Sequence, residues 1–317
     1  MKVSLITTVF NEEESIVYFL KSVFGQTKLP DEIIIVDGGS TDGTVKKISE
    51  FNFSDIKNAP NIKLIFKKGN RSVGRNSAIK KASGDVILIS DGGCVLDRNW
   101  VKNILEPFLD KKIDVVAGYY RGLAKNVFEK SLIPYVLVME DRVKENNFLP
   151  ATRSMALRKT VWEKTGKFDE KLSHNEDYAF ANKIKKAGFK ILFKKSAIVY
   201  WLPRKNLVQA FIMFFRFALG DIQANIFRRK VIYIFLRYIF ALLVLLVSII
   251  TGSLYILGFL LVGFLVYSGW AIWKNYKYVK NLRAVIYLPF FQYLSDLAVL
   301  LGSSWGMLQK LILALTK

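Results

Sequence analysis

The sequence predicts an α/β fold in which a mostly parallel sheet is sandwiched by helices, followed by an amphipathic interface helix and C-terminal transmembrane helices. Two observations lead to this prediction. In the first half, runs rich in Ile and Val alternate with helix-like stretches, the order typical of parallel sheets. Beyond Tyr238, long stretches carry no charge. We therefore expect an α/β domain at residues 1–203, an amphipathic helix at 204–230 and a membrane domain at 231–317 with two or three hydrophobic segments.

Four apolar runs define the expected parallel strands. They cover residues 3–9, 32–37, 62–66 and 85–91, and the helix-like stretches between them cover residues 15–25, 44–53 and 74–83. In sheets of this kind, helices cover both faces and ligands bind beyond the carboxyl ends of the strands. Asp37 and Asp91 end two of the runs, so we expect both side chains to face the same crevice.

From Trp100 the alternation loosens. We expect a helix, then a strand at about residues 113–120, and a mixed stretch to Leu149 that could form the acceptor side of a site. The remaining expected elements are a loop at residues 171–175, a helix at about 176–187 that Gly188 would end, and a strand at 190–200.

Residues 204–227 form the pattern of an amphipathic helix. Polar side chains at Lys205, Gln209, Arg216 and Gln223 make a narrow stripe, and Leu207, Phe211, Phe214, Phe215, Ala218, Ile222 and Ile226 make a broad apolar face. A wide aromatic face with a basic stripe favours a membrane interface. The same pattern also fits a helix packed on its own domain, so both interpretations stay open.

Residues 238–273 contain no charged side chain. As one helix this segment would be about 54 Å long, against a hydrocarbon core of about 30 Å, so we expect two spans joined at residues 251–253. Basic residues lie on both flanks, at Arg228, Arg229, Lys230 and Arg237 before the pair and at Lys274, Lys277, Lys280 and Arg283 after it. This distribution predicts a multi-pass protein of the plasma membrane, with both flanks and the α/β domain in the cytoplasm.

A third apolar segment runs from Ala284 to about Leu308 and is interrupted by Pro289. It carries an acidic residue, Asp296, and a small-residue spacing from Gly302 to Gly306 that suits close helix packing. Its path, spanning or re-entrant, stays open at this point.

Composition narrows the range of partners. The formal net charge is +21, from 47 Lys and Arg against 26 Asp and Glu, so the surface should attract polyanions. The basic residues crowd beside the hydrophobic segments and form no recognised nucleic-acid module, so we expect membrane lipids and not nucleic acid as partners. The apolar start at residues 3–10 is too short for a secretory signal. The single cysteine, Cys94, is interpreted as a packing residue.

Several spaced motifs point to one family. Residues 7–13 read TTVFNEE, residues 33–44 read IIIVDGGSTDGT, residues 75–79 read RNSAI and residues 82–87 read ASGDVI; DGG follows at 91–93, GKFDE at 166–170, and Glu176-Asp177 after it. Together these motifs resemble the family 2 glycosyltransferases with the GT-A fold, over about residues 2–201. The resemblance implies an inverting glycosyltransferase that moves a sugar from a nucleotide diphosphate sugar, expected to be UDP-linked, to a lipid-linked or polysaccharide acceptor.

The resemblance assigns roles to residues of this chain. Thr8, Glu12, Asp37, Arg75 and Asp91 would contact the donor, Asp177 would be the catalytic base and Glu176 would lie beside it. Residue chemistry leaves alternatives open for several of them. Asp37 could accept from a uracil N–H or ribose hydroxyls, or could be a plain turn residue.

Other polar residues near these motifs also have two interpretations. Glu12 could serve a helix N-terminus, and Asp42 could cap the next helix. We prefer Arg75 over Arg71 as a phosphate ligand because Arg71 could be a solvated loop charge. His174, the one histidine, is interpreted as a solvated loop residue.

One departure from the family pattern concerns the metal. Gly93 stands where the family usually has a second Asp. In this motif, Asp91 alone is therefore available as a ligand for a divalent cation, Mg²⁺ or Mn²⁺. This loss motivates an alternative, a catalytically silent nucleotide-sugar-binding scaffold subunit of a glycan assembly complex. No G-x-G-x-x-G turn or P-loop follows a strand, which argues against a dinucleotide oxidoreductase and a P-loop ATPase.

Overall fold

The computed structural model describes residues 1–52 and 60–316. The chain divides into two compact units, one of residues 1–123 with 139–202 and one of residues 124–138 with 203–317. The second unit thus includes residues 124–138, which the sequence analysis grouped with the α/β domain. The three functional domains expected from the sequence stay a proposal. The two units are described separately.

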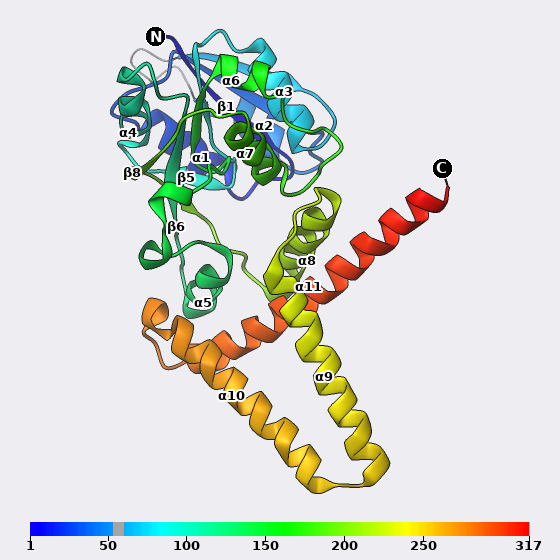
Figure 1. Cartoon of the computed structure of the whole chain (residues 1–317). Helices are drawn as coiled ribbons and strands as arrows, with labels where there is room; N and C mark the ends of the chain where they lie inside the picture. Colours follow the sequence, from blue (N-terminus) through cyan, green and yellow to red (C-terminus); the bar gives the residue numbers. More distant parts are fainter. Residues whose placement is uncertain (53–59, 317) are drawn as a thin grey trace. The chain divides into compact units, whose positions relative to one another are not determined.

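The first unit is built on an eight-stranded sheet with the order β3-β2-β1-β4-β7-β6-β8-β5 among the described residues (Figure 1). The strands are β1 (Val3–Val9), β2 (Glu32–Asp37), β3 (Asn61–Phe66), β4 (Val86–Ile89), β5 (Cys94–Leu96), β6 (Val115–Gly122), β7 (Met155–Arg158) and β8 (Ile191–Trp201). The first four strands are mutually parallel, and β7 and β5 are antiparallel to their neighbours. The predicted α/β class is confirmed.

Helices cover both faces of this sheet. They are α1 (Ile16–Phe24), α2 (Thr44–Ser49), α3 (Arg71–Lys81), α4 (Trp100–Leu105), α6 (Lys159–Lys164) and α7 (Glu176–Lys186), with short 3₁₀ turns η1 (Glu106–Leu109), η2 (Glu140–Arg142) and η3 (Glu145–Asn147). On one face, Ile6, Ile34 and Ile87 pack with Ala78 of α3 and Phe180 of α7. Alternate strand residues point to opposite faces, and those between them, Leu5, Ile33 and Leu88, are also fully buried. The sheet is therefore covered on both sides, as parallel strands require.

Some element boundaries differ from the expected ones. Helix α3 begins at Arg71 and not at residue 74, because the Asn70 side chain caps it by accepting from the Val73 N–H at 3.1 Å. Strand β4 ends at Ile89, and Asp91 lies in the following turn, where its carbonyl accepts from the Cys94 N–H. Residue 53, where the second expected helix would end, lies outside the described residues. Strand β7 and helix α6 were not predicted at all.

The second unit consists of α5 (Val127–Val136), α8 (Leu207–Gln223), α9 (Arg229–Thr251), α10 (Leu254–Val279) and α11 (Ala284–Leu315). The last three are long and apolar enough to cross a membrane, with 23, 26 and 32 residues. Helices α9 and α10 are joined by a turn, as predicted at residues 251–253 (Figure 1). Gly252 in this turn takes the left-handed conformation, φ 65°. Helix α11 continues through Pro289, so the interruption expected there is absent; Leu288 and Phe291 on either side are fully buried, and this packing holds the helix together.

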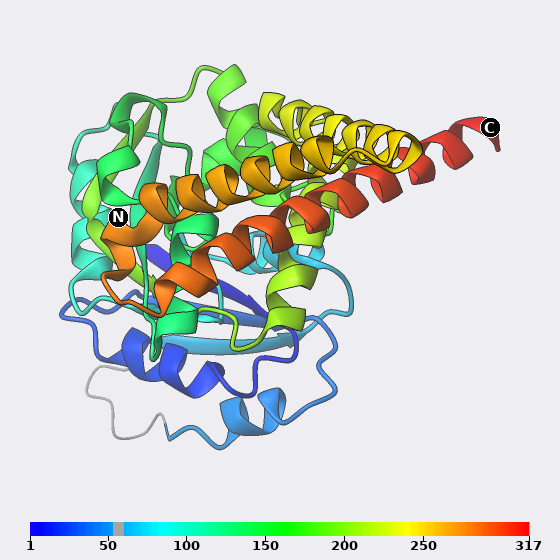
Figure 2. The same ribbon diagram turned by 90° about the horizontal axis from the view of Figure 1, so that it is seen from below.

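Close contacts join the helices of the second unit. A side-chain carbon at Gly302 would lie 2.5 Å from the Phe215 carbonyl oxygen, and one at Gly306 would lie 2.8 Å from Ile222, so α8 and α11 meet where the sequence has small residues. Tyr293 of α11 stacks on Phe264 of α10, two helices that run alongside each other in Figure 2.

A buried carboxylate ties the three long helices together. Asp296 of α11 accepts from the Tyr238 hydroxyl of α9 and the Tyr267 hydroxyl of α10, at 3.2 and 2.7 Å, and from Gln292 of its own helix at 3.1 Å. Arg237 lies 3.7 Å from the same carboxylate. A charge in an apolar helix bundle is costly unless it is paired in this way.

Candidate functional site

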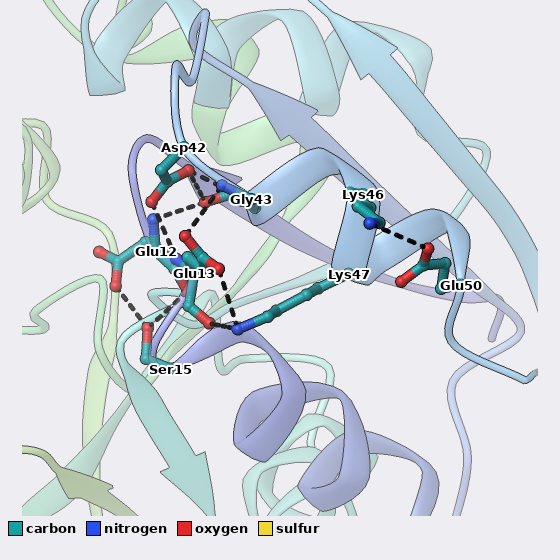
Figure 3. Close-up of polar contacts among 9 residues, drawn as sticks. Glu12, Glu13, Ser15, Asp42, Gly43, Lys46, Lys47 and Glu50 are labelled. Atoms are coloured by element: carbon teal, nitrogen blue, oxygen red, sulfur yellow. Dashed lines mark hydrogen bonds and ion pairs between the residues drawn. The ribbon is translucent and has the colours of Figure 1, made fainter.

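The loops after β1 and β2 are joined by a small polar network (Figure 3). The Glu12 N–H donates to Thr44 Oγ1 at 2.7 Å, and the Gly43 N–H donates to Glu13 Oε2 at 3.0 Å. Asp42 accepts from the N–H of Thr44 and from the N–H of Glu13, at 3.0 and 3.2 Å. The Asp42 side chain thus holds Thr44, the first residue of α2, although the N-cap position itself is Gly43, which has no side-chain cap.

Asp37 lies at the last position of β2, as predicted, and its side chain is 2% exposed. Its carboxylate accepts from the N–H groups of Gly39 and Ser40 at 2.9 and 3.1 Å. Gly39 has a φ of +102°, so the turn needs a residue without a side chain there. These contacts match the turn interpretation of Asp37, and they also fix the carboxylate at the end of the strand.

Arg75 connects the two carboxylate groups of the expected site. Its Nη1 donates to Glu176 Oε1 at 2.6 Å, and its Nη2 donates to Asp91 Oδ1 and to Thr152 Oγ1, both at 2.9 Å. The arginine side chain is 2% exposed, so its donors face these partners and not solvent. Burial alone would lower the pKa of Arg75, but the neighbouring carboxylates of Glu176 and Asp91 raise it above its usual value.

The next residue, Asn76, fixes the 166–170 motif to α3. Its amide donates to the Phe168 carbonyl and to Glu170 Oε1, both at 2.9 Å, and its carbonyl oxygen accepts from the Phe168 N–H at 3.1 Å. Trp162 also donates to this oxygen at 3.0 Å. The motifs at 75–79 and 166–170, far apart in the sequence, are therefore one structural unit.

The N-terminus of α7 carries the two candidate catalytic carboxylates. Asn175 precedes the helix in the left-handed conformation, φ 55°, and Glu176 is buried against Arg75. Burial raises the pKa of Asp177, and Glu176 raises it further, while Arg75 and Arg153 oppose the shift. A carboxyl with a raised pKa is a stronger base than an ordinary aspartate, which suits proton abstraction. His174, expected to be a solvated loop residue, is half-buried.

The surroundings of Gly93 bear on metal binding. A side-chain carbon at Gly93 would lie 3.4 Å from Glu12 Oε2, so the Glu12 carboxylate lies beside the position of the missing Asp. Glu12 also accepts from the Ser15 hydroxyl at 2.5 Å (Figure 3). Asp91 is 34% exposed and shares one oxygen with Arg75. Within residues 1–52 and 60–316, no group of three or more His, Cys, Asp or Glu could hold a metal ion.

Two carboxylates are nevertheless compatible with a divalent cation that is held jointly with a substrate. Magnesium keeps several waters and is commonly bound by one or two carboxylates together with phosphate oxygens. Asp91, two residues before Gly93 in the chain, and Glu12, beside Gly93 in space, could supply such a donor set. The side chains therefore fit a cation that a diphosphate helps to bind.

Thr8, another residue expected to contact the donor, lies near the end of β1 and close to α3. The Thr8 methyl group lies 2.7 Å from a side-chain carbon built at Gly74, so β1 and α3 approach closely only because residue 74 is glycine. Cys94 is buried in β5, and burial raises the pKa of its thiol, in agreement with a packing role.

Sequence reasoning missed Arg153, whose positive charge interacts with the negative charges of Asp91 and Asp177. Its guanidinium carbon is 5.7 Å from the centre of the Tyr120 ring and 6.0 Å from that of Trp201. Burial lowers the pKa of Arg153, but Asp91, Cys94, Tyr120 and Asp177 together raise it above its usual value. A lone arginine between two small polar residues, Thr152 and Ser154, in an otherwise apolar stretch was the available signal.

Comparison with known proteins agrees with this fold. Residues 4–166 match the family described as glycosyl transferase family 2. Glycosyltransferase AglE of Haloferax volcanii is 27% identical over 248 residues, which cover 76% of this chain and 78% of that protein. A dolichyl N-acetyl-alpha-D-glucosaminyl phosphate 3-beta-D-2,3-diacetamido-2,3-dideoxy-beta-D-glucuronosyltransferase of Methanococcus voltae is 27% identical over 272 residues, covering 80% of this chain and 83% of that protein.

A solved structure supports the same fold. The mannosyltransferase of Pyrobaculum calidifontis in complex with GDP-Man and Mn²⁺ superposes with a TM-score of 0.66, covering 96% of this chain and 87% of that chain at 16% identity. At this identity the likeness shows the fold alone, and it confirms the GT-A fold expected from the motifs. Since the family match spans more than half of the chain, from β1 to the residues before α7, this glycosyltransferase belongs to glycosyl transferase family 2.

Proposed function

We propose that the protein is an inverting glycosyltransferase that moves a sugar from a nucleotide diphosphate sugar, UDP-linked, to a lipid-linked or polysaccharide acceptor at a membrane. One observation carries this proposal. Arg75 holds Glu176, at the start of α7, and Asp91, beyond the end of β4, through two ion pairs of 2.6 and 2.9 Å. Arg75 thus links the donor-side carboxylate to Glu176, the residue that precedes the candidate base Asp177 in α7.

Asp177 is assigned as the base. In an inverting transfer the acceptor oxygen forms a bond to the anomeric carbon while the bond from that carbon to the diphosphate oxygen breaks. The electron pair leaves with the nucleoside diphosphate, and the acceptor proton goes to Asp177. Burial and the neighbouring Glu176 raise the pKa of Asp177, which supports this role. Glu176 itself is committed to Arg75 and is assigned to holding the helix N-terminus in place.

The donor side is assigned to Thr8, Glu12, Asp37, Asp91 and Arg75. Asp37 would contact the nucleoside, and Arg75 would act by orienting Asp91. Asp91 and Glu12 would hold a divalent cation, Mg²⁺ or Mn²⁺, which would supply positive charge to the diphosphate when bound. The relative from Pyrobaculum calidifontis is a complex with GDP-Man and Mn²⁺, and this supports the use of a cation by the fold.

The acceptor is assigned from relatives and from the apolar helices. The Methanococcus voltae relative acts on a dolichyl-linked sugar phosphate, and a relative from Escherichia coli, 34% identical over 128 residues, acts on a diphosphoundecaprenol-linked sugar. Three helices long enough to cross a membrane follow the transferase unit, and basic residues flank α9 and α10. We infer a multi-pass protein of the plasma membrane with its transferase unit in the cytoplasm.

A transfer assay tests the proposal. Full-length protein in native membranes would receive a panel of radiolabelled sugar nucleotides, and products would be separated into lipid and aqueous phases. We expect lipid-phase product with one donor, and its loss by a factor of about 10² to 10⁴ in Asp177→Asn, with nucleotide binding retained. A scaffold subunit would bind donor and turn none over, in the parent as in the variant.

A further inference from the structure

The segment that carries Arg153 is held rigidly on both sides of this residue. The Ser90 hydroxyl donates to the Arg153 carbonyl at 2.9 Å, just before Asp91 in the chain. Thr152 accepts from Arg75, and the Ser154 N–H donates to the Ala151 carbonyl at 2.9 Å. A preorganised backbone of this kind fixes where the arginine side chain begins.

Among the described residues, the N–H donors of the Arg153 guanidinium are not used by other side chains. Within the two described ranges, 1–52 and 60–316, its side chain forms no hydrogen bond and no ion pair; it packs over the rings of Tyr120 and Trp201 at 5.7 and 6.0 Å. Arg75, in contrast, uses its donors on Glu176, Asp91 and Thr152. Arg153 is also partly exposed, whereas Arg75 is buried. Of these two arginines, Arg153 is the one that can reach a ligand.

We propose that Arg153 binds the diphosphate of the sugar donor and stabilises the charge that develops on the leaving nucleoside diphosphate. This inference rests on the proposed function and adds a residue to it. A planar guanidinium matches two phosphate oxygens at once, and the aromatic rings beneath it hold its plane. As the bond between the anomeric carbon and the diphosphate oxygen breaks, negative charge builds on that oxygen, and a fixed donor there lowers the barrier.

The charges near Arg153 fit this role. Asp91 and Asp177 both interact electrostatically with Arg153, yet neither is hydrogen-bonded to it. The positive charge of the Arg153 guanidinium is therefore stabilised by nearby carboxylates, and its N–H donors remain available to a phosphate.

Nucleotide binding to the full-length protein in detergent tests the proposal without any turnover. Calorimetry would compare uridine and guanosine mono- and diphosphates, once with saturating Mn²⁺ and once with a chelator, for the parent and Arg153→Gln. We expect the preference of the parent for the better-bound diphosphate over its monophosphate to fall by about tenfold or more, since a hydrogen bond to a charged group is lost. An unchanged preference in Arg153→Gln would overturn the proposal.

Two further variants complete the test. Arg121→Gln, which removes a 42% exposed arginine paired with Glu140 at the end of β6, is the matched charge control and should leave the preference unchanged. If Arg153→Gln shows no cooperative thermal unfolding, Arg153→Lys decides: it keeps the charge but not the planar fork, so an intermediate preference supports the proposal and a parental one overturns it. Failure of the proposed function would show differently, as absence of sugar turnover in the parent with every donor.

Discussion

Arg75 and Glu176 form a buried ion pair in which Nη1 lies 2.6 Å from Oε1, with 2% and 4% of the two side chains exposed. The pair joins α3 to the N-terminus of α7, and its two residues are 101 positions apart in the sequence. Because Asp91 accepts from the same guanidinium, the pair also orients the donor-side carboxylate. Arg75 therefore links α3, α7 and Asp91, and its expected role as a phosphate ligand stays a prediction.

We predict that Arg75→Met destabilises the transferase unit strongly, because Glu176 would be left as an uncompensated buried charge, at a cost of about 3 to 5 kcal/mol. The double variant Arg75→Met with Glu176→Leu should recover much of the loss, since an apolar pair replaces a buried ion pair. Thermal unfolding midpoints of the two variants and of Arg71→Met, an exposed control on the same helix, would be measured. If Arg75→Met unfolds like the parent and only loses nucleotide affinity, then Arg75 is a phosphate ligand after all.

The pH dependence of transfer gives a second prediction. A base must be deprotonated to act, so the rate falls as the pH falls through the pKa of Asp177. Burial and Glu176 raise this pKa above the ordinary 3.8, and Arg153 lowers it. The acidic limb of kcat/KM should therefore lie above pH 3.8 in the parent and move to higher pH in Arg153→Gln. Arg121→Gln should leave the limb in place, and an unshifted limb in Arg153→Gln would separate Arg153 from the base.

Much of the site could be predicted from local sequence. Asp37 was placed correctly because an Ile-rich run followed by glycines marks a strand end, and the turn at Gly252 followed from the length of an uncharged segment. Asp91 was expected at a strand end and lies two residues beyond it, since β4 stops at Ile89. Strand ends and turns could be predicted because they depend on residues that are neighbours in the chain.

Contacts between distant segments could not be predicted in this way. Nothing near Arg75 in the sequence shows that Glu176 and Thr152 surround it, so these contacts could not be predicted. Strand β7 has four residues, too few for a clear alternation, and its antiparallel pairing with β4 is set by the sheet and not by its own sequence. Arg153 precedes β7, and its contacts with Tyr120 of β6 and Trp201 of β8 likewise join segments that are distant in the sequence.

Gly93→Asp provides a third prediction, about metal binding. A side-chain carbon at this position would meet Glu12 Oε2 at 3.4 Å, an ordinary contact distance, so the variant should fold without moving the backbone. A third carboxylate beside Asp91 and Glu12 should raise the affinity for Mn²⁺ in the presence of a nucleoside diphosphate by on the order of tenfold. Calorimetric titration would measure it, with Gly93→Asn as the neutral control of the same shape. Equal affinities in the Asp and Asn variants would remove Asp91 and Glu12 from the cation site.

The last prediction concerns separation of the two units. A chain ending at Pro203 would keep every assigned donor and catalytic residue but lose α11, on which α5 packs. The Phe128 ring of α5 lies 4.9 Å from that of Phe291, and the Tyr135 hydroxyl donates to the Leu288 carbonyl at 2.5 Å. Removal of α11 would expose this face of α5, so we expect the simple truncation to aggregate.

A second deletion should rescue solubility. Residues 125–137 would be replaced by a Gly-Ser linker of about ten residues, long enough for a flexible connection. The ends are held near each other because Arg121 Nη2 lies 2.6 Å from Glu140 Oε1. We expect this shortened chain to be monomeric by light scattering and to bind nucleoside diphosphate as tightly as the full-length protein, because Asp37, Asp91 and Arg153 all belong to the first unit. If it unfolds cooperatively yet binds no nucleotide, the second unit contributes directly to the donor site, and the assignment of that site to the first unit alone is wrong.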